Sequence, residues 1–261
     1  MINSARNPQI KEIQALNQKH KERAKSGLFV AEGRKLFLEA PKELVQRIYV
    51  SETFAKEEQT LLDGRSFEVI EDSLFERICD TKTPQGILSI IKQPVYKRDD
   101  LLGDRKRQPF LLLLEDLQDP GNVGTILRTA EGAGVSGIIL SKKCADLFQP
   151  KVIRSTMGSI FRVPFIYEEN LEEVLSWLRS QNIHSYGAHL KGECSYSEPS
   201  YRGGSVIFIG NEGNGLSSYL TENCDTLIKI PMEGKLESLN AAIASAILMY
   251  TVHEKRFKER T

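Results

Sequence analysis

The segment Asn122–Arg128 carries two polar side chains that could do chemistry, an amide and a guanidinium. Asn122 follows the turn-forming pair Pro120-Gly121 and stands where the N-cap of a helix belongs. Arg128 falls within that helix, whose other face is apolar. Taken alone, the two are best explained as an ordinary cap and a solvated arginine. In a parallel sheet, however, both would lie at the carboxyl edge, where such folds bind ligands.

A second segment, Gly210–Ser217, has three glycines within six residues and a carboxylate, Glu212, between them. Glycines let a backbone approach a ligand closely and donate N–H groups to it. A carboxylate suits a cationic or hydroxyl-bearing ligand better than a phosphate. The alternative is a tight turn before a helix capped by Ser217 or Ser218, which explains the glycines but not Glu212.

The third segment, residues 230–250, begins where a strand ends, because Pro231 forbids its continuation. Ser238 could cap the helix that follows. Small residues at 241, 242 and 244–246 would allow this helix to pack very closely. By itself the segment predicts only a buried helix with a polar cap.

Strands and helices alternate around these three segments. Apolar runs at 110–117, 135–140, 205–210 and 226–230 are typical of strands buried on both faces of a parallel sheet. Helices are expected at 122–134, ended by Gly134, and at 239–257. An α/β layered fold is therefore predicted. Residues 132–137 fit G-x-G-x-x-G, but they end a helix and begin a strand, the reverse of a dinucleotide site, which weakens an oxidoreductase alternative.

The first 92 residues show shorter elements. Strands are expected at 28–32, 47–50 and 86–91, and helices at 8–19, 34–40 and 71–79, which together predict a small α/β sandwich. Residues 93–109 lie between two prolines, are rich in charge and have no apolar period. This stretch is the best candidate for a linker.

The overall charge is balanced, since Lys+Arg and Asp+Glu both number 35. Any attraction to nucleic acid must come from local asymmetry, such as residues 1–35 with eight basic and three acidic residues. The four cysteines and four histidines are scattered, which predicts neither disulfides nor a metal site and fits a reducing cytoplasm. No apolar signal region or membrane-spanning stretch is expected.

In combination the three segments are much more specific. NVGTILR, IGNEGNGLS and IPMEGKLESLNAAIASAI, in this order, resemble the signature motifs of the SpoU/TrmH family of RNA 2′-O-ribose methyltransferases. RSTMGSIFRVPF (154–165) resembles the family's segment between the first two motifs. SARNPQIKEIQAL, FVAEGRKLFLEA and TPQGILSI resemble an accessory RNA-binding domain. The resemblance implies an RNA substrate-binding domain at 1–92, a linker at 93–106 and a trefoil-knotted, parallel-sheet methyltransferase domain at 107–261.

The resemblance also implies the site and its cofactor, S-adenosylmethionine, with no metal. Arg128 would activate the ribose hydroxyl, although a guanidinium has no acceptor and is hard to deprotonate, so we expect it to grip phosphate and stabilise alkoxide charge. Residues positioning Arg128 and the ribose would be Asn122, Glu212, Ser238 and Asn240. Cofactor-binding residues would be Gly210, Asn211, Ile230 and Leu239, with Met232, Ala188 and Leu190 around the adenosine.

The substrate class follows from the implied reaction, because the 2′-hydroxyl distinguishes RNA from DNA. We expect ribosomal rather than transfer RNA, because of the appended N-terminal domain. A homodimer is expected through the knotted domain. One remaining alternative is a transfer RNA methyltransferase. The other is a non-catalytic RNA-binding factor for ribosome assembly, and the intact polar positions argue against this second alternative.

Overall fold

The computed structural model describes residues 1–104 and 106–258, and their contacts divide the chain into two compact units. The first unit contains Met1–Pro94 together with Asp146–Phe161. The second contains Val95–Ala145 and Arg162–Thr261, so the chain leaves it for one short segment and returns. Every helix in the described ranges is too short or too polar to cross a membrane.

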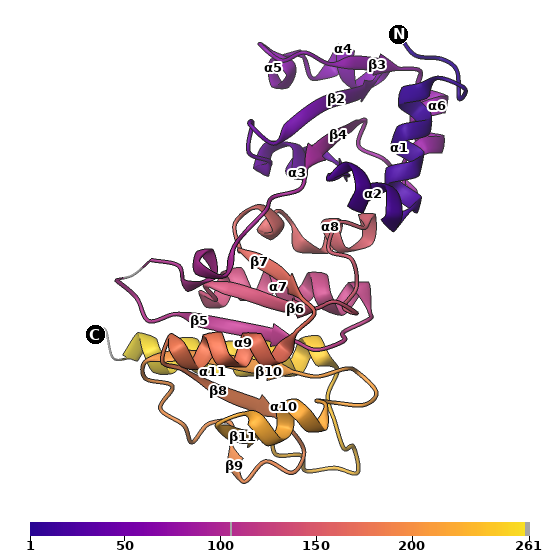
Figure 1. Cartoon of the computed structure of the whole chain (residues 1–261). Helices are drawn as coiled ribbons and strands as arrows, with labels where there is room; N and C mark the ends of the chain where they lie inside the picture. The colour runs from indigo at the N-terminus through magenta and orange to yellow at the C-terminus, as the bar shows by residue number, and fades with distance from the viewer. Residues whose placement is uncertain (105, 259–261) are drawn as a thin grey trace. The chain divides into compact units, whose positions relative to one another are not determined.

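The first unit is built on a four-stranded sheet in the order β1-β4-β2-β3 (Figure 1). β4 is antiparallel to both of its neighbours, and β2 and β3 are parallel. The strands are β1 Leu28–Glu32, β2 Val45–Ser51, β3 Glu68–Ile70 and β4 Ile87–Lys92; the helices are α1 Pro8–Gln18, α2 His20–Ser26, α3 Arg34–Glu39, α4 Glu52–Glu57, α5 Gln59–Leu62, α6 Asp72–Ile78 and α8 Pro150–Thr156.

Strands β1, β2 and β4 and helices α1, α3 and α6 confirm the elements predicted for this part of the sequence. The sequence patterns missed α2, α4, α5 and β3. Strand β3 has only three residues, and the buried residue of α2 is a cation, Arg23. Neither element offers the apolar period on which such predictions depend.

Arg23 is buried rather than solvated, although it belongs to the basic N-terminal stretch. Its guanidinium donates to the carbonyl oxygen of Leu16 at 2.6 Å and lies 2.7 Å from the carboxylate of Asp146. A buried ion pair with additional hydrogen bonds is a packing feature. Arg23 is therefore engaged within the first unit and is not available to a ligand.

The segment 146–161 contributes apolar residues to the core of the first unit. Helix α8 packs against β1, and its Val152 and Ile153 are buried. The ring of Phe29 in β1 lies 5.1 Å from that of Phe148 and 6.2 Å from that of Phe161, measured between centroids. Aromatic contacts of this kind stabilise a core beyond simple burial. The first unit is thus built from two separate stretches of the sequence.

The second unit is built on a seven-stranded sheet in the order β7-β6-β5-β10-β8-β11-β9, and all of its pairings are parallel. This confirms the predicted α/β fold with a parallel sheet. The strands are β5 Phe110–Leu114, β6 Gly137–Ser141, β7 Phe165–Glu168, β8 Ile183–Ala188, β9 Cys194–Ser195, β10 Gly204–Ile209 and β11 Thr226–Lys229; the helices are α7 Pro120–Ala133, α9 Leu171–Ser180, α10 Ser218–Asn223 and α11 Ala241–Lys258.

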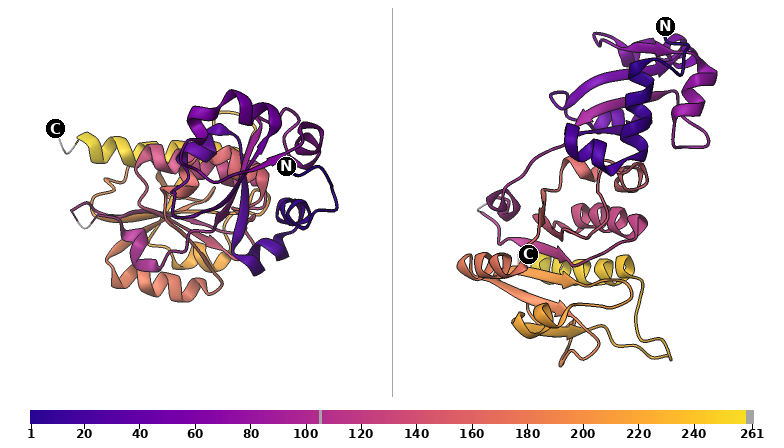
Figure 2. Two further views of the ribbon diagram at one scale, coloured as in Figure 1. Left: turned by 90° about the horizontal axis from the view of Figure 1, so that it is seen from above. Right: turned by 45° about the vertical axis from the view of Figure 1, so that its right-hand side comes forward.

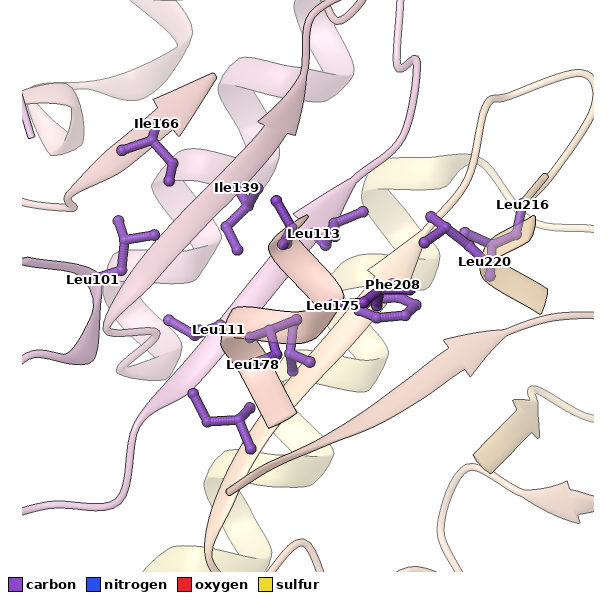
Figure 3. Packing of buried hydrophobic residues seen from close by; sticks show 13 residues of the cluster. Leu101, Leu111, Leu113, Ile139, Ile166, Leu175, Leu178, Phe208, Leu216 and Leu220 are labelled. Carbon is purple, nitrogen blue, oxygen red and sulfur yellow. The ribbon is translucent and has the colours of Figure 1, made fainter. Parts of the chain in front are cut away.

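Helices cover both faces of this sheet. Figures 1 and 2 show α7 and α11 on one face and α9 and α10 on the other. Leu111 and Leu113 of β5 and Phe208 of β10 pack with Leu175 and Leu178 of α9 (Figure 3). All five residues of β5 are buried, as expected for a central strand covered on both sides.

The linker predicted at 93–106 is not entirely irregular. Arg98–Leu102 form a short 3₁₀ helix, and Leu101 is fully buried in the core of the second unit. The sequence pattern did not predict this element because only one of its side chains, that of Leu101, is buried. The predicted helix end at Gly134 is confirmed, since this residue has a φ of 75° directly after α7. β6 begins at Gly137, so the glycine pattern at 132–137 indeed precedes a strand.

Candidate active site

Helix α7 starts earlier than the sequence suggested, and this changes the role of Asn122. The helix begins at Pro120, and the side chain of Asp119 caps it by accepting the N–H of Asn122 at 2.8 Å. The prediction that Asn122 is the N-cap was wrong, because proline fits the first helical position well. The amide of Asn122, in the first turn, is therefore free to bond elsewhere.

Asn122, Glu212 and Asn240 form a continuous chain of hydrogen bonds. Asn122 Nδ2 donates to Glu212 Oε1 at 3.1 Å, and Asn240 Nδ2 donates to Asn122 Oδ1 at 3.0 Å. These residues come from the first, second and third motifs, so the structure joins the three segments singled out by sequence. Asn122 uses both ends of its amide, which fixes its orientation.

The carboxylate of Glu212 also anchors the loop before α7. Its two oxygens accept the backbone N–H groups of Gln118 at 3.2 Å and Asp119 at 3.1 Å. Burial raises the pKa of Glu212, but the hydrogen bonds from Asn122 and from the backbone outweigh burial and leave the pKa below its ordinary value. A carboxylate so stabilised in its ionised form is a weak base.

The glycine turn is organised by the side chain of Asn211. Its Oδ1 accepts the N–H groups of Gly213 at 3.0 Å and Asn214 at 3.1 Å, and its Nδ2 donates to the carbonyl of Asp116 at 2.8 Å. These are contacts within the protein, although Asn211 was predicted to bind the cofactor. Ser217 caps α10, as the alternative interpretation of this segment had it.

Gly210 is required by the fold of the turn itself. A Cβ atom added there would lie 2.1 Å from the carbonyl carbon of Gly215 and 2.2 Å from the nitrogen of Leu216. The backbones of Asn211 and Gly215 pair across the turn with two hydrogen bonds of 2.9 Å. This close crossing leaves no room for any side chain.

The helix of the third motif is capped by a different residue from the one predicted. Asn240 caps α11 by accepting the N–H groups of Ala242 at 2.9 Å and Ile243 at 3.3 Å. The suggestion that Ser238 caps this helix was wrong, because α11 begins at Ala241, too far along the chain for that hydroxyl. Ser238 is exposed, and its side chain has no hydrogen-bond partner within the described ranges.

The residues predicted to hold the cofactor gather at the carboxyl ends of neighbouring strands. Gly210 follows β10, Ala188 ends β8, and Ile230 follows β11. These strands are adjacent in the order β10-β8-β11. Met232, Ile230 and Leu239 are half-buried, while Leu190 is 60% exposed.

The segment 231–239 suits a ligand with both apolar and polar groups. Residues 231–239 form no hydrogen bond with any described residue, so their backbone C=O groups, and the N–H groups of all of them except Pro231, remain available. Exposed leucines lie in this segment and in the loop after β8, at Leu236 and Leu190. Apolar side chains with a few polar donors and acceptors are typical of sites that bind small molecules.

Arg128 lies on α7, six residues beyond Asn122, or roughly 9 Å along the helix at about 1.5 Å per residue. It is exposed, and its guanidinium has no hydrogen bond or ion pair with any described residue. It is therefore outside the hydrogen-bonded chain of Asn122, Glu212 and Asn240. Its charge is unneutralised within this part of the protein.

Three acidic residues that the sequence motifs did not predict support this site. Glu115 is buried at the end of β5 and accepts the N–H of Ser217 at 2.7 Å. Asp116, with a φ of 54°, accepts a hydrogen bond from Ser141 at 2.6 Å. Asp119 caps α7, which the pair Asp119-Pro120 could have signalled. No cluster of three potential metal ligands occurs in the described residues.

Comparison with known proteins identifies the family. Residues 109–250 match the model of the SpoU rRNA Methylase family, and residues 7–89 match the MRM3-like substrate binding domain. The chain is 35% identical over 251 residues to the 23S rRNA (guanosine(2553)-2′-O)-methyltransferase RlmP of Bacillus subtilis, covering 95% of this chain and 97% of that protein. The chain belongs to the SpoU rRNA methylase family.

Solved structures of SpoU-type enzymes share the fold over nearly the whole chain. An AdoMet-bound rRNA methyltransferase from Sinorhizobium meliloti has a TM-score of 0.84 and 31% identity, with 97% of each chain covered. The SpoU methyltransferase AviRb from Streptomyces viridochromogenes, in complex with AdoMet, has a TM-score of 0.84 and 26% identity, with 97% of this chain and 100% of that chain covered. The family and fold class predicted from the sequence are confirmed.

Proposed function

We propose that this chain transfers the methyl group of S-adenosylmethionine to a ribose 2′-hydroxyl of ribosomal RNA. The observation that carries the proposal is the hydrogen-bonded chain Asn240–Asn122–Glu212, which joins the three SpoU motifs. It lies at the carboxyl edge of a parallel sheet, where folds of this class bind ligands. Family membership supports the reaction, and RlmP, a relative along its whole length, acts on 23S rRNA by its name.

The cofactor, when bound, supplies a methyl group on a positively charged sulfur, which is already a good donor. The protein must then hold the 2′-oxygen in line and help to remove its proton. Backbone groups at Gly210, Ile230 and Leu239 are proposed to hold the cofactor in the trefoil knot that the family resemblance implies. Met232 and the segment 188–190 would line the adenosine.

Arg128 is proposed to bind the RNA phosphate next to the reacting ribose and to stabilise negative charge on the 2′-oxygen. Its exposed guanidinium, unpaired among the described residues, is available for this role. Glu212 is proposed as a positioning residue, because both of its oxygens already accept N–H groups. The free hydroxyl of Ser238 is proposed to contact the ribose.

We propose a homodimer through α11. Ile243, Tyr250 and Phe257 are 53%, 49% and 55% exposed and are spaced seven residues apart, so they form one apolar stripe along the helix. Such a stripe is typical of a helix that packs against a partner. The cytoplasm is proposed as the location because ribosomal RNA is the proposed substrate.

Methyl transfer to defined RNAs tests the proposal. The purified full chain is incubated with labelled S-adenosylmethionine and with 23S rRNA, 16S rRNA or total transfer RNA, each free of modification. We expect label only in ribosomal RNA, as one 2′-O-methyl nucleotide. Label in transfer RNA alone would favour the alternative substrate, and RNA binding without label in any RNA would favour a non-catalytic assembly factor.

A further inference from the structure

A cavity of about 300 Å³ opens in the first unit, whereas the three motifs lie in the second. Most of its wall residues lie within the stretches 32–36 and 81–87, and the others are Arg154 and Met157 at the end of α8. The volume is at the lower end of ligand pockets, which span roughly 300–1,000 Å³. It therefore suits one small group rather than an RNA duplex.

The floor of the cavity is apolar and its rim carries hydrogen-bonding groups. Leu36 and Ile87 are buried in the floor. On the rim, Gln85 Oε1 accepts the backbone N–H of Arg34 at 2.9 Å, which directs the Nε2 amide away from that contact. Neither Gln85 Nε2 nor the hydroxyl of Thr83 has a partner in the described ranges. This combination suits a planar group with polar edges.

One cation at the cavity is available to an anion. Lys35 is exposed and has no partner among the residues described. The carboxylate of Glu32 is turned to the backbone, since it accepts the N–H of Asp80 at 2.6 Å and the hydroxyl of Thr81 at 3.0 Å. Asp80 also lies 2.6 Å from the guanidinium of Arg154. The four charges balance, so an anion at the cavity would be held by Lys35, the cation that has no partner among the described residues.

Met157 occupies a position that normally belongs to glycine. It ends α8 with a φ of 52°, in the left-handed region that other residues adopt at a cost. Its side chain is 37% exposed and lines the cavity. A strained residue that presents a long apolar side chain to a cavity indicates that the side chain has a use.

We propose that this cavity receives one unstacked nucleotide of the RNA substrate, with its base against Met157 and Leu36 and its phosphate beside Lys35. Sequence-specific proteins commonly read RNA through bases displaced from loops and bulges. The inference rests on the proposed function for the nature of the ligand. It adds that a segment of the methylase sequence, α8, builds part of the RNA-binding surface.

Binding assays with paired variants of the full chain test this inference. The probe is the ribosomal RNA fragment that the wild-type chain binds most tightly, with a fully complementary duplex of the same strand for comparison. Lys35→Ala should weaken binding and flatten the log–log salt slope by about 0.7–0.9, one phosphate contact. Met157→Gly should weaken binding roughly tenfold with an unchanged slope, since it removes apolar contact equivalent to about two methylene groups.

Matched controls separate binding from folding. Glycine fits the backbone at 157 without strain, so Met157→Gly should leave the Tm unchanged or higher. Phe67→Ala, at a residue that is also 37% exposed, and Lys56→Ala, on exposed α4, should bind RNA as the wild type does. Affinity for S-adenosylhomocysteine should be unchanged in all four variants. Wild-type RNA affinity in both cavity variants would overturn the inference.

Photocrosslinking gives an independent readout of the same site. 4-Thiouridine placed at unpaired positions of the fragment should crosslink to peptides that contain 32–36, 81–87 or 154–157. Crosslinks only to peptides elsewhere would contradict the inference while leaving the proposed function standing. A chain that crosslinks at the cavity but transfers no methyl group would support the inference and contradict the proposed function.

Discussion

The Nδ2 of Asn122 lies 3.1 Å from Oε1 of Glu212, although ninety positions separate the two residues in the sequence. This hydrogen bond connects the first turn of α7 to the glycine turn after β10. It fixes the carboxylate that also accepts the N–H groups of Gln118 and Asp119. Two segments of the proposed site are thus tied directly to each other.

A double-mutant cycle measures this coupling. Asn122→Ala, Glu212→Gln and the double variant should show a coupling free energy of about 1 kcal/mol in denaturant unfolding, typical of one partly exposed hydrogen bond. Thr125→Ala, on the exposed side of the same helix, is the control partner and should be additive with Glu212→Gln. Additivity in both cycles would show that the hydrogen bond between Asn122 and Glu212 contributes nothing to the free energy of unfolding.

The lowered pKa of Glu212 predicts how its contribution depends on pH. A carboxyl whose folded pKa is depressed contributes stability above its unfolded pKa, about 4.3, and loses that contribution as the pH falls through the folded pKa. The stability difference between wild type and Glu212→Gln should be constant near neutral pH and shrink only below about pH 4.3. Urea unfolding from pH 7 to pH 3 measures it. A difference that grows on acidification would contradict the direction of the shift.

Arg128→Ala should slow methyl transfer by about 10²–10³-fold, because one preorganised charge-stabilising donor is lost. Folding and cofactor affinity should change little, since Arg128 is exposed and has no hydrogen bond or ion pair with the described residues. Arg128→Lys distinguishes two roles. A simple point charge would restore much of the rate, whereas bidentate phosphate binding would not survive the exchange. Single-turnover assays at saturating cofactor measure the methyl-transfer rate of both variants. A normal rate in Arg128→Ala would show that Arg128 has no part in the mechanism.

Gly210→Ala should destabilise the fold by at least about 2 kcal/mol, because its Cβ would overlap the backbone of Gly215 and Leu216. Loss of cofactor binding in this variant would then be a consequence of misfolding of the turn. Gly213→Ala is the matched control, since its Cβ would meet only Asn211 Oδ1 at 3.6 Å. Thermal unfolding and calorimetry with S-adenosylhomocysteine separate the effects. A stable Gly210→Ala that fails to bind would point to direct contact with the ligand instead.

Tyr250→Glu should dissociate the proposed dimer, because it places a charge in the middle of the apolar stripe on α11. Tyr219→Glu on α10, where the tyrosine is 39% exposed, is the control and should leave the oligomer intact. Light scattering at micromolar concentration measures the mass of each. A monomeric wild-type chain with full activity would overturn the proposed dimer.

The parallel sheet could be predicted because its strands are nearly continuous apolar runs, such as FLLLL in β5. The partners within the site were harder to predict. Asn122 and Ser238 are both residue types that cap helices, and a shift of two or three residues in the helix start gave these roles to Asp119 and Asn240. Propensities alone fix such boundaries poorly, since several neighbouring polar residues compete for one cap.

The packing of α8 in the first unit could not have been foreseen for a different reason. Val152 and Ile153 have the pattern of any buried helix face, and nothing in that pattern says which core they enter. Only the contacts of α8 with β1 show that they belong to the core of the first unit. Apolar periodicity identifies a buried surface but not its partner.

The interrupted course of the chain limits how such proteins can be recombined. Because residues 146–161 complete the core of the first unit, exchanging only the N-terminal 94 residues between relatives would set one parent's Phe29 against another parent's Phe148 and Phe161. We expect such chimeras to be poorly stable and expect stability to return when both stretches come from the same parent. RNA specificity and methyl transfer in this lineage would therefore be inherited together rather than shuffled as separate modules.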